Sequence, residues 1–171
     1  MNIAAYIKQI EQQQKELDAL YHNAAVRYGL SDSVMWILYQ IAAAKETVTQ
    51  QDLCRQCFFA KQTVHSAVAN LVQNGYVRLE TIPKTRNQKR IVLTEKGQKL
   101  CHDTVDHLRE AESRAYGKLT AEELQTYLQL NEKLTALLRE EIEQPKIEQF
   151  KSKQQQTQIE QPAQAKGAND R

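Results

Sequence analysis

Residues 49 to 97 read TQQDLCRQCFFAKQTVHSAVANLVQNGYVRLETIPKTRNQKRIVLTEKG, and this stretch decides the fold of the chain. A polar-capped short helix is predicted over residues 49–56, followed by a short turn. A second helix is predicted over residues 61–74, where Asn74-Gly75 ends it. An alternating pair of strands with a basic tip follows. Two helices joined by a turn and followed by a hairpin form a winged helix-turn-helix.

The second of these helices has one apolar and one polar face. Its apolar residues recur at helical spacing and are expected to be buried: Val64, Val68, Leu71 and Val72. The polar residues of its first half point away from that stripe: Lys61, Gln62, Thr63, His65 and Ser66. A buried stripe beneath a hydrogen-bonding face is what a helix needs to enter a groove of DNA, so these five residues are candidate DNA contacts. For His65, an exposed side chain without a ligand is an equal alternative.

Basic residues gather at the hairpin tip, around the turn at residues 83–88: Lys84, Arg86, Lys89 and Arg90. The whole chain has a net charge of only +2, whereas residues 60–99 hold eight lysines and arginines against two glutamates, a local charge of +6. Basic side chains that neutralise phosphates release condensed counterions, which favours binding to duplex DNA. The alternative is a winged helix used only for protein–protein contact, but such a surface has no need of a basic wing.

Composition places the chain in a broad class. Its 171 residues, of which 41% are hydrophobic, can bury a core of ordinary size, and the length predicts one compact unit. No apolar run approaches the roughly 20 residues of a membrane span, and residues 1–14 lack the apolar block of a signal peptide. Three cysteines without a dense framework fit a reducing compartment. We therefore expect a cytoplasmic protein that does not bind membranes.

Both ends of the chain are amphipathic. Residues 2–28 are predicted to form one long helix that stops at Gly29, and residues 94–143 hold further helices, the last beginning at the capping box Thr120-x-x-Glu123. These end helices carry more apolar surface than a small DNA-binding domain can cover. We therefore expect them to pack together and onto a second subunit, as a homodimer.

The predicted fold class is mostly α with a small β wing. A winged helix-turn-helix domain at residues 30–97 is joined to a helical dimerisation region formed by the N- and C-terminal helices. Residues 144–171 contain eight glutamines and few large apolar side chains, so this tail is predicted to be disordered.

Three segments in this order and spacing carry a family resemblance: Gly29-Leu30-Ser31, then Val68-x-x-Leu71-Val72-x-x-Gly75-Tyr76-Val77, then Lys89-Arg90-Ile91-Val92-Leu93-Thr94-Glu95-Lys96-Gly97. The chain resembles the MarR family of bacterial winged-helix regulators over residues 2 to about 143. The third segment is similar to the family's second wing strand, which runs into a Leu-Thr-x-x-Gly helix start.

The resemblance implies an obligate homodimer that binds a pseudo-palindromic operator and usually represses a nearby promoter. It also implies release from DNA when a small, often phenolic ligand enters the crevice between the dimer helices and the DNA-binding domain, or when a cysteine is oxidised. By position, Arg86 matches the wing-tip arginine that enters the minor groove, and residues 61–66 match the start of the recognition helix. Thr85 stands where the family has an acidic residue, so Arg86 lacks that orienting carboxylate.

Two roles are open for a set of aromatic residues at helical spacing. They are candidates to line an effector crevice near the dimer junction, or they fill the core, as aromatic residues on helices usually do. These residues are Tyr21, Tyr28, Trp36 and Tyr39.

The cysteines offer weaker alternatives. Cys54-x-x-Cys57 has the spacing of a zinc or redox pair, but no second ligand pair follows, and a small apolar thiol on a short helix is also a good packing residue. Cys101, with neighbouring histidines and an aspartate, offers a one-helix metal site of a kind that also arises by chance.

Catalysis has no support in the sequence. There is no nucleophile elbow, no phosphate-cradling glycine loop and no His-Glu-x-x-His, and the chain has only five glycines. We expect neither an enzyme nor a bound cofactor or metal.

Overall fold

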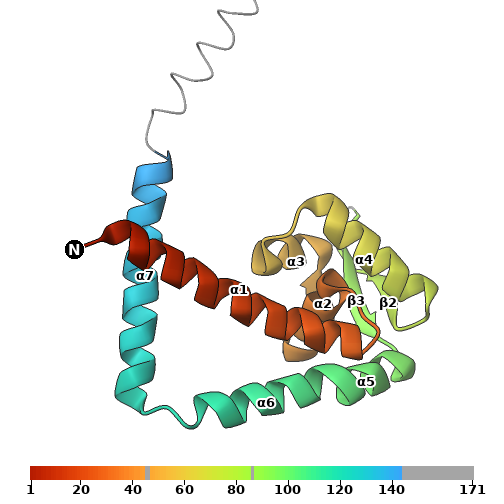
Figure 1. Cartoon of the computed structure of the whole chain (residues 1–171). Coiled ribbons are helices and arrows are strands. Elements are labelled where there is room, and N and C mark those ends of the chain that lie inside the picture. The colour runs from red at the N-terminus through yellow and green to blue at the C-terminus, as the bar shows by residue number, and fades with distance from the viewer. Residues whose placement is uncertain (45–46, 86, 144–171) are drawn as a thin grey trace, which may run out of the picture. The chain divides into compact units, whose positions relative to one another are not determined.

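The computed structural model describes residues 1–44, 47–85 and 87–143 (Figure 1). The chain divides into two units, Met1–Ala115 and Tyr116–Arg171, where its length had predicted one. The predicted fold class is confirmed, since helices dominate and the only sheet of the described residues is small. The predicted disordered tail lies outside the described residues.

Helices form most of the first unit. In chain order its elements are α1 (Ile3–Arg27), α2 (Asp32–Ala43), β1 (Val48–Thr49), α3 (Gln50–Cys57), α4 (Lys61–Gln73), β2 (Val77–Thr81), β3 (Lys89–Leu93), α5 (Glu95–Cys101), a π-helical turn (His102–Asp106) and α6 (His107–Tyr116). The second unit contains α7 (Ala121–Glu143). None of the described helices is long and apolar enough to cross a membrane.

The core of the first unit is built around α2. This helix contacts α1, α3, α4 and α5 (Figure 1), and its Met35, Ile37 and Leu38 are almost completely buried. Leu53 of α3 is also fully buried. Burying a side chain of this size contributes roughly 1.5–3 kcal/mol. The helix-turn-helix is therefore held on a packed support.

A three-stranded antiparallel sheet forms the wing, in the order β1-β3-β2. The predicted hairpin is β2 and β3, in which Leu79 faces Ile91. The third strand, β1, was not predicted because it is only two residues long, too short for an alternating pattern. Its Val48 pairs with Ile91, so the base of the wing is tied to the residues just before α3.

Side-chain caps fix where most helices of the domain begin. Ser31, Thr49 and Thr94 accept hydrogen bonds from the backbone N–H groups at the starts of α2, α3 and α5, respectively. The predicted capping box at Thr49 is present, because the Asp52 carboxylate accepts from the Thr49 N–H in return. Hydrogen bonds from Thr49 are the main reason why the pKa of Asp52 is lowered. Such caps contribute about 1 kcal/mol each.

Candidate nucleic-acid interface

Helix α4 presents the polar face that the sequence predicts. All five candidate contacts on it are exposed: Lys61, Gln62, Thr63, His65 and Ser66. Val64, Val68 and Leu71 are buried as expected. Val72 was expected to be buried and is 38% exposed, because Ala67 completes the inward stripe and Val72 falls at its edge. The stripe is thus turned slightly toward the start of α2.

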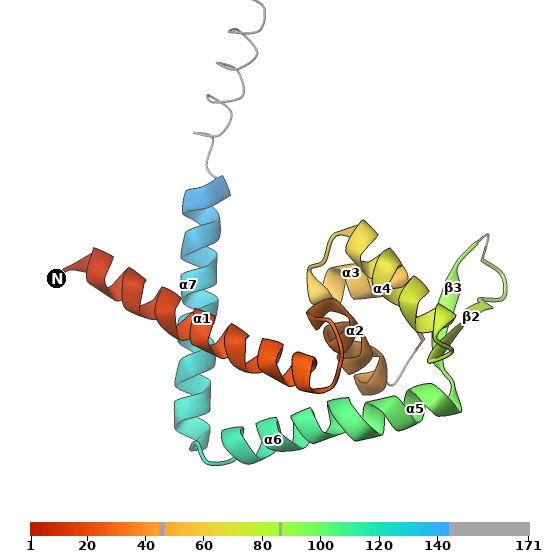
Figure 2. The same cartoon turned by 45° about the vertical axis from the view of Figure 1, so that its right-hand side comes forward.

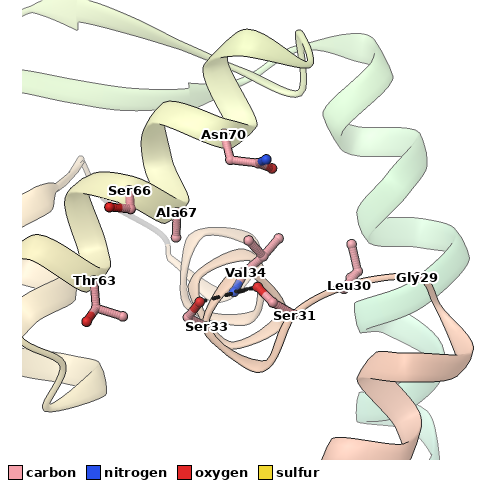
Figure 3. A pocket seen from close by; sticks show the side chains of 9 residues that line it. All are labelled: Gly29, Leu30, Ser31, Ser33, Val34, Thr63, Ser66, Ala67 and Asn70. Carbon is pink, nitrogen blue, oxygen red and sulfur yellow. Dashed lines mark hydrogen bonds between the residues drawn. The ribbon is translucent and has the colours of Figure 1, made fainter.

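That rotation brings the first half of α4 beside the start of α2. Thr63 and Ser66 line one side of an open hollow of about 390 Å³, and Ser31 and Ser33 line the other (Figure 3). The hydroxyl oxygens of the two α2 serines lie 3.3 Å apart. Hydroxyl-bearing residues of both helices therefore line one shared hollow.

The start of α4 lacks the capping that its neighbours have. Its N-cap residue is Ala60, which makes no side-chain capping hydrogen bond, and its first turn contains no acidic residue. Lys61 adds a positive charge there. Free N–H groups and the helix dipole favour an anion at such an end. The start of α4 therefore presents no acidic group that would oppose an anion.

The wing projects from the same side of the unit as α4 (Figure 2). Lys84 and Lys89 are exposed near its tip, and Lys84 adopts a left-handed backbone with φ of 64°. The Thr85 hydroxyl donates to the Ile82 carbonyl over 2.8 Å, so this residue shapes the turn. The candidate contact Arg86 lies outside the described residues.

Glu80 changes the charge of the wing. Its carboxylate accepts from the Arg78 guanidinium at 2.7 Å and from the Arg90 guanidinium at 2.6 Å. Hydrogen bonds from these two arginines lower the pKa of Glu80. The candidate contact Arg90 is therefore ion-paired, whereas Lys84 and Lys89 take part in no ion pair among the described residues. This ion pair was not predicted from the sequence, although Glu80 and Arg90 are opposite one another in the hairpin register.

The aromatic candidates gather where α1, α2 and α6 meet. The Trp36 ring centroid lies 5.0 Å from that of Tyr21 and 5.5 Å from that of Tyr39. Glu112 of α6 accepts from both tyrosine hydroxyls, at 2.8 Å from Tyr21 and 2.6 Å from Tyr39. The fourth candidate, Tyr28, is the C-cap residue of α1, two helical turns beyond Tyr21.

Charged residues of α6 complete this cluster. The Arg109 guanidinium lies 4.5 Å from the centre of the Tyr39 ring and donates to the Tyr39 carbonyl. Burial, followed by the hydrogen bond to Glu112, raises the pKa of Tyr39. Sequence reasoning missed Glu112 and Arg109, because charged residues on an amphipathic helix usually face solvent.

The thiols of Cys57 and Cys101 are not activated. Burial, and next the neighbouring Cys54, raises the pKa of Cys57. Burial and Asp106 raise the pKa of Cys101 to about 11. Since the thiolate is both the nucleophile and the metal ligand, these two thiols are poorly reactive near neutral pH. Nowhere in the described ranges do three His, Cys, Asp or Glu side chains gather as a metal site would need.

Both the sequence and the structure of the chain are similar to those of known winged-helix proteins. A sequence model of the MarR family matches residues 28–86. No curated protein matches the chain. A MarR family regulator from Neisseria meningitidis has a similar structure, with a TM-score of 0.69 and 16% identity over 83% of this chain and 97% of that one.

Two similar structures contain bound molecules. The complex of S. aureus MepR with DNA matches with a TM-score of 0.65 and 20% identity, over 80% of this chain and 99% of that one. Staphylococcus aureus MarR in complex with salicylate and kanamycin matches with a TM-score of 0.61 and 16% identity, over 81% and 93% of the two chains.

The domain is therefore a winged helix-turn-helix of the MarR type. The resemblance predicted from the sequence is confirmed by the family match and by the shared fold. The similar structures include proteins described as MarR family transcriptional regulators.

Proposed function

We propose that the protein is a cytoplasmic transcriptional regulator that binds a specific duplex DNA sequence through α4 and the wing. The observation that carries the proposal is the first half of α4. Five polar side chains are exposed there above a completely buried stripe, on a helix whose N-terminus is free of caps and acidic groups. A rigid helix with this face fits the major groove.

The two elements have different tasks in this proposal. Gln62 and Ser66 belong to the row opposite the buried stripe, so they contact base edges and carry sequence preference. Lys84 and Lys89, together with Arg86 by resemblance, contact the backbone and the minor groove. The MepR complex supports DNA binding by this fold, because a protein of the same fold was solved with DNA.

A homodimer follows from apolar surface on α1 and α7. Helix α1 buries only Ala24 and Ala25, while large apolar side chains along it stay exposed: Ile3, Tyr6, Ile7, Ile10, Leu17 and Leu20. Helix α7 buries no residue and exposes Tyr127, Leu128, Leu130, Leu134, Leu137, Leu138 and Ile142. Exposed apolar stripes of this length are usually buried against a partner, and we assign that partner to a second copy of the chain. A pseudo-palindromic operator then matches the two-fold symmetry.

Regulation is assigned to repression that a small aromatic or phenolic ligand relieves. The cluster of Tyr21, Trp36 and Tyr39 joins the long helix α1 to α2, the support of α4. A ligand that displaced these rings would shift α2 and, with it, α4. The staphylococcal structure in complex with salicylate supports a small aromatic ligand for a protein of this fold.

Selection of DNA from a random duplex pool by the wild-type protein tests the proposal. We expect enrichment of one pseudo-palindrome whose half-sites lie about 10 base pairs apart, one turn of the double helix. A pool that stays random after repeated rounds would reject sequence-specific binding. A wild-type protein that is folded but binds no duplex at all would favour the protein–protein module instead.

A further inference from the structure

Phe58 combines two unfavourable features. It lies in the turn between α3 and α4, and its side chain is 93% exposed. Its backbone is left-handed, with φ of 53° and ψ of 26°. Left-handed backbone favours glycine or asparagine, and a large apolar side chain normally favours burial. Phe58 is the C-cap of α3, so its left-handed backbone ends that helix, but nothing in the free chain calls for a phenylalanine side chain there.

Of the two adjacent phenylalanines in this turn, only Phe59 packs against the core. Phe59 is partly buried and packs against the hydrophobic core, while Phe58 is directed outward. Backbone outliers that bring no packing are found preferentially at functional sites. The left-handed backbone and exposed ring of Phe58 thus point to a contact that the free protein lacks.

Its position defines what it can contact. Phe58 precedes Lys61, the first residue of α4, by three residues, and the α3–α4 turn lies directly beside the N-terminus of α4 (Figure 1). We propose that the Phe58 ring packs against the C5 methyl group of a thymine in the major groove, next to the bases that α4 contacts. Phenylalanine is one of the side chains that make this apolar base contact. The inference rests on the proposed DNA binding by α4.

The surroundings favour DNA over a protein partner. Protein docking sites present contiguous apolar patches. Between α2 and the end of β3, the described residues expose only two large apolar side chains: Phe58, in the turn before α4, and Val72, near the C-terminal end of α4. Phe58 is instead followed by Lys61 and the uncapped helix start. A single ring beside a positive helix end matches a nucleic-acid surface.

Two substitutions separate this role from a structural one. Phe58→Asn removes the ring and suits the left-handed backbone, so it should raise the melting temperature by about 2–4 °C. On the duplex that the wild type selects, the same variant should bind about tenfold more weakly. Phe58→Tyr keeps the ring and should bind within about twofold of the wild type. A merely strained residue would give the thermal gain without the loss of affinity.

Replacing thymines of the selected duplex by deoxyuridine, one at a time, identifies the contact. At one position the missing methyl group should weaken the wild type and leave the Phe58→Asn variant unaffected, since the two changes remove the same contact. If the variant binds every duplex as the wild type does, or if no single deoxyuridine substitution weakens the wild type while leaving the variant unaffected, the inference is wrong. If the wild type selects no duplex, the proposed function fails together with the Phe58 contact. If it selects one duplex and Phe58→Asn binds that duplex equally well, only the Phe58 contact fails.

Discussion

The carbonyl oxygen of Tyr76 lies so close to Gly97 that a Cβ atom at residue 97 would stand 1.9 Å from it. This contact joins the end of α4 to the start of α5. Thr94 reinforces it, because its N–H donates to the same carbonyl over 3.0 Å and its hydroxyl donates to the Gly75 carbonyl over 2.6 Å. The Lys96 ammonium donates to the Asn74 carbonyl. Two of the sequence segments that carry the family resemblance are therefore one structural unit.

Gly97→Ala should destabilise the fold by about 1–3 kcal/mol, because the added methyl group overlaps a backbone oxygen that cannot rotate away. Urea denaturation measures the change. Gly75→Ala is the control, since a Cβ there meets nothing within 4 Å and only the left-handed backbone opposes it. That control should cost about 1 kcal/mol. Equal losses in the two variants would contradict the close approach at Gly97.

Tyr39 should contribute stability that disappears in alkali. Its pKa is raised by burial and by Glu112, so its contribution is complete below the unfolded-state pKa of about 10 and is lost as the pH rises through the folded-state value. The difference in unfolding free energy between wild type and Tyr39→Phe should be constant from pH 7 to about 9 and shrink above 10. Glu112→Gln, which removes the charge, should weaken this alkaline loss. A difference independent of pH would disprove the linkage.

Peroxide should leave DNA affinity unchanged. The raised pKa values keep Cys57 and Cys101 protonated near pH 7, and a thiol reacts far more slowly than a thiolate. The measurement is the Kd for the selected duplex before and after peroxide treatment. If the wild type loses affinity while a Cys54→Ser, Cys57→Ser double variant does not, the pair is a redox sensor after all.

Charges on the apolar stripe of α7 should break the dimer. Leu134 and Leu138 are 39% and 49% exposed in the single chain, and the proposed dimer would bury them. Replacing both by Glu should weaken dimerisation by several kcal/mol, at roughly 3–5 per unpaired buried charge. Light scattering at micromolar concentration reports the mass. Gln129→Glu, on the other side of the helix, should remain dimeric, and a monomeric wild type would remove the basis for two half-sites.

Local patterns predicted most of the fold. The apolar spacing of α4, the Thr49 capping box and the basic hairpin each depend on residues close together in the chain. The errors and omissions were long-range. Neither the position of Val72 at the edge of the stripe nor the pairing of β1 with β3 follows from local spacing.

In the candidate site, too, local features were predicted and long-range contacts were not. The exposed residues of α4 were predicted, since a helical face is a local property. Glu112, which holds two tyrosines from α1 and α2, is 91 and 73 residues away from them in sequence, and nothing in α6 itself indicates this role. Phe58 could not be recognised either, because its left-handed backbone and its exposure appear only in three dimensions.

In the proposed function, α4 reads base sequence and the wing supplies affinity for any duplex. The most direct measurement is a pair of titrations, with the selected duplex and with a random duplex, over a salt series for Gln62→Ala and Lys89→Ala. Gln62→Ala should lose about 1–3 kcal/mol on the selected duplex and much less on random DNA. Lys89→Ala should lose on both duplexes and reduce the salt slope by about one. If Gln62→Ala loses equally on both duplexes, direct readout by this helix is wrong.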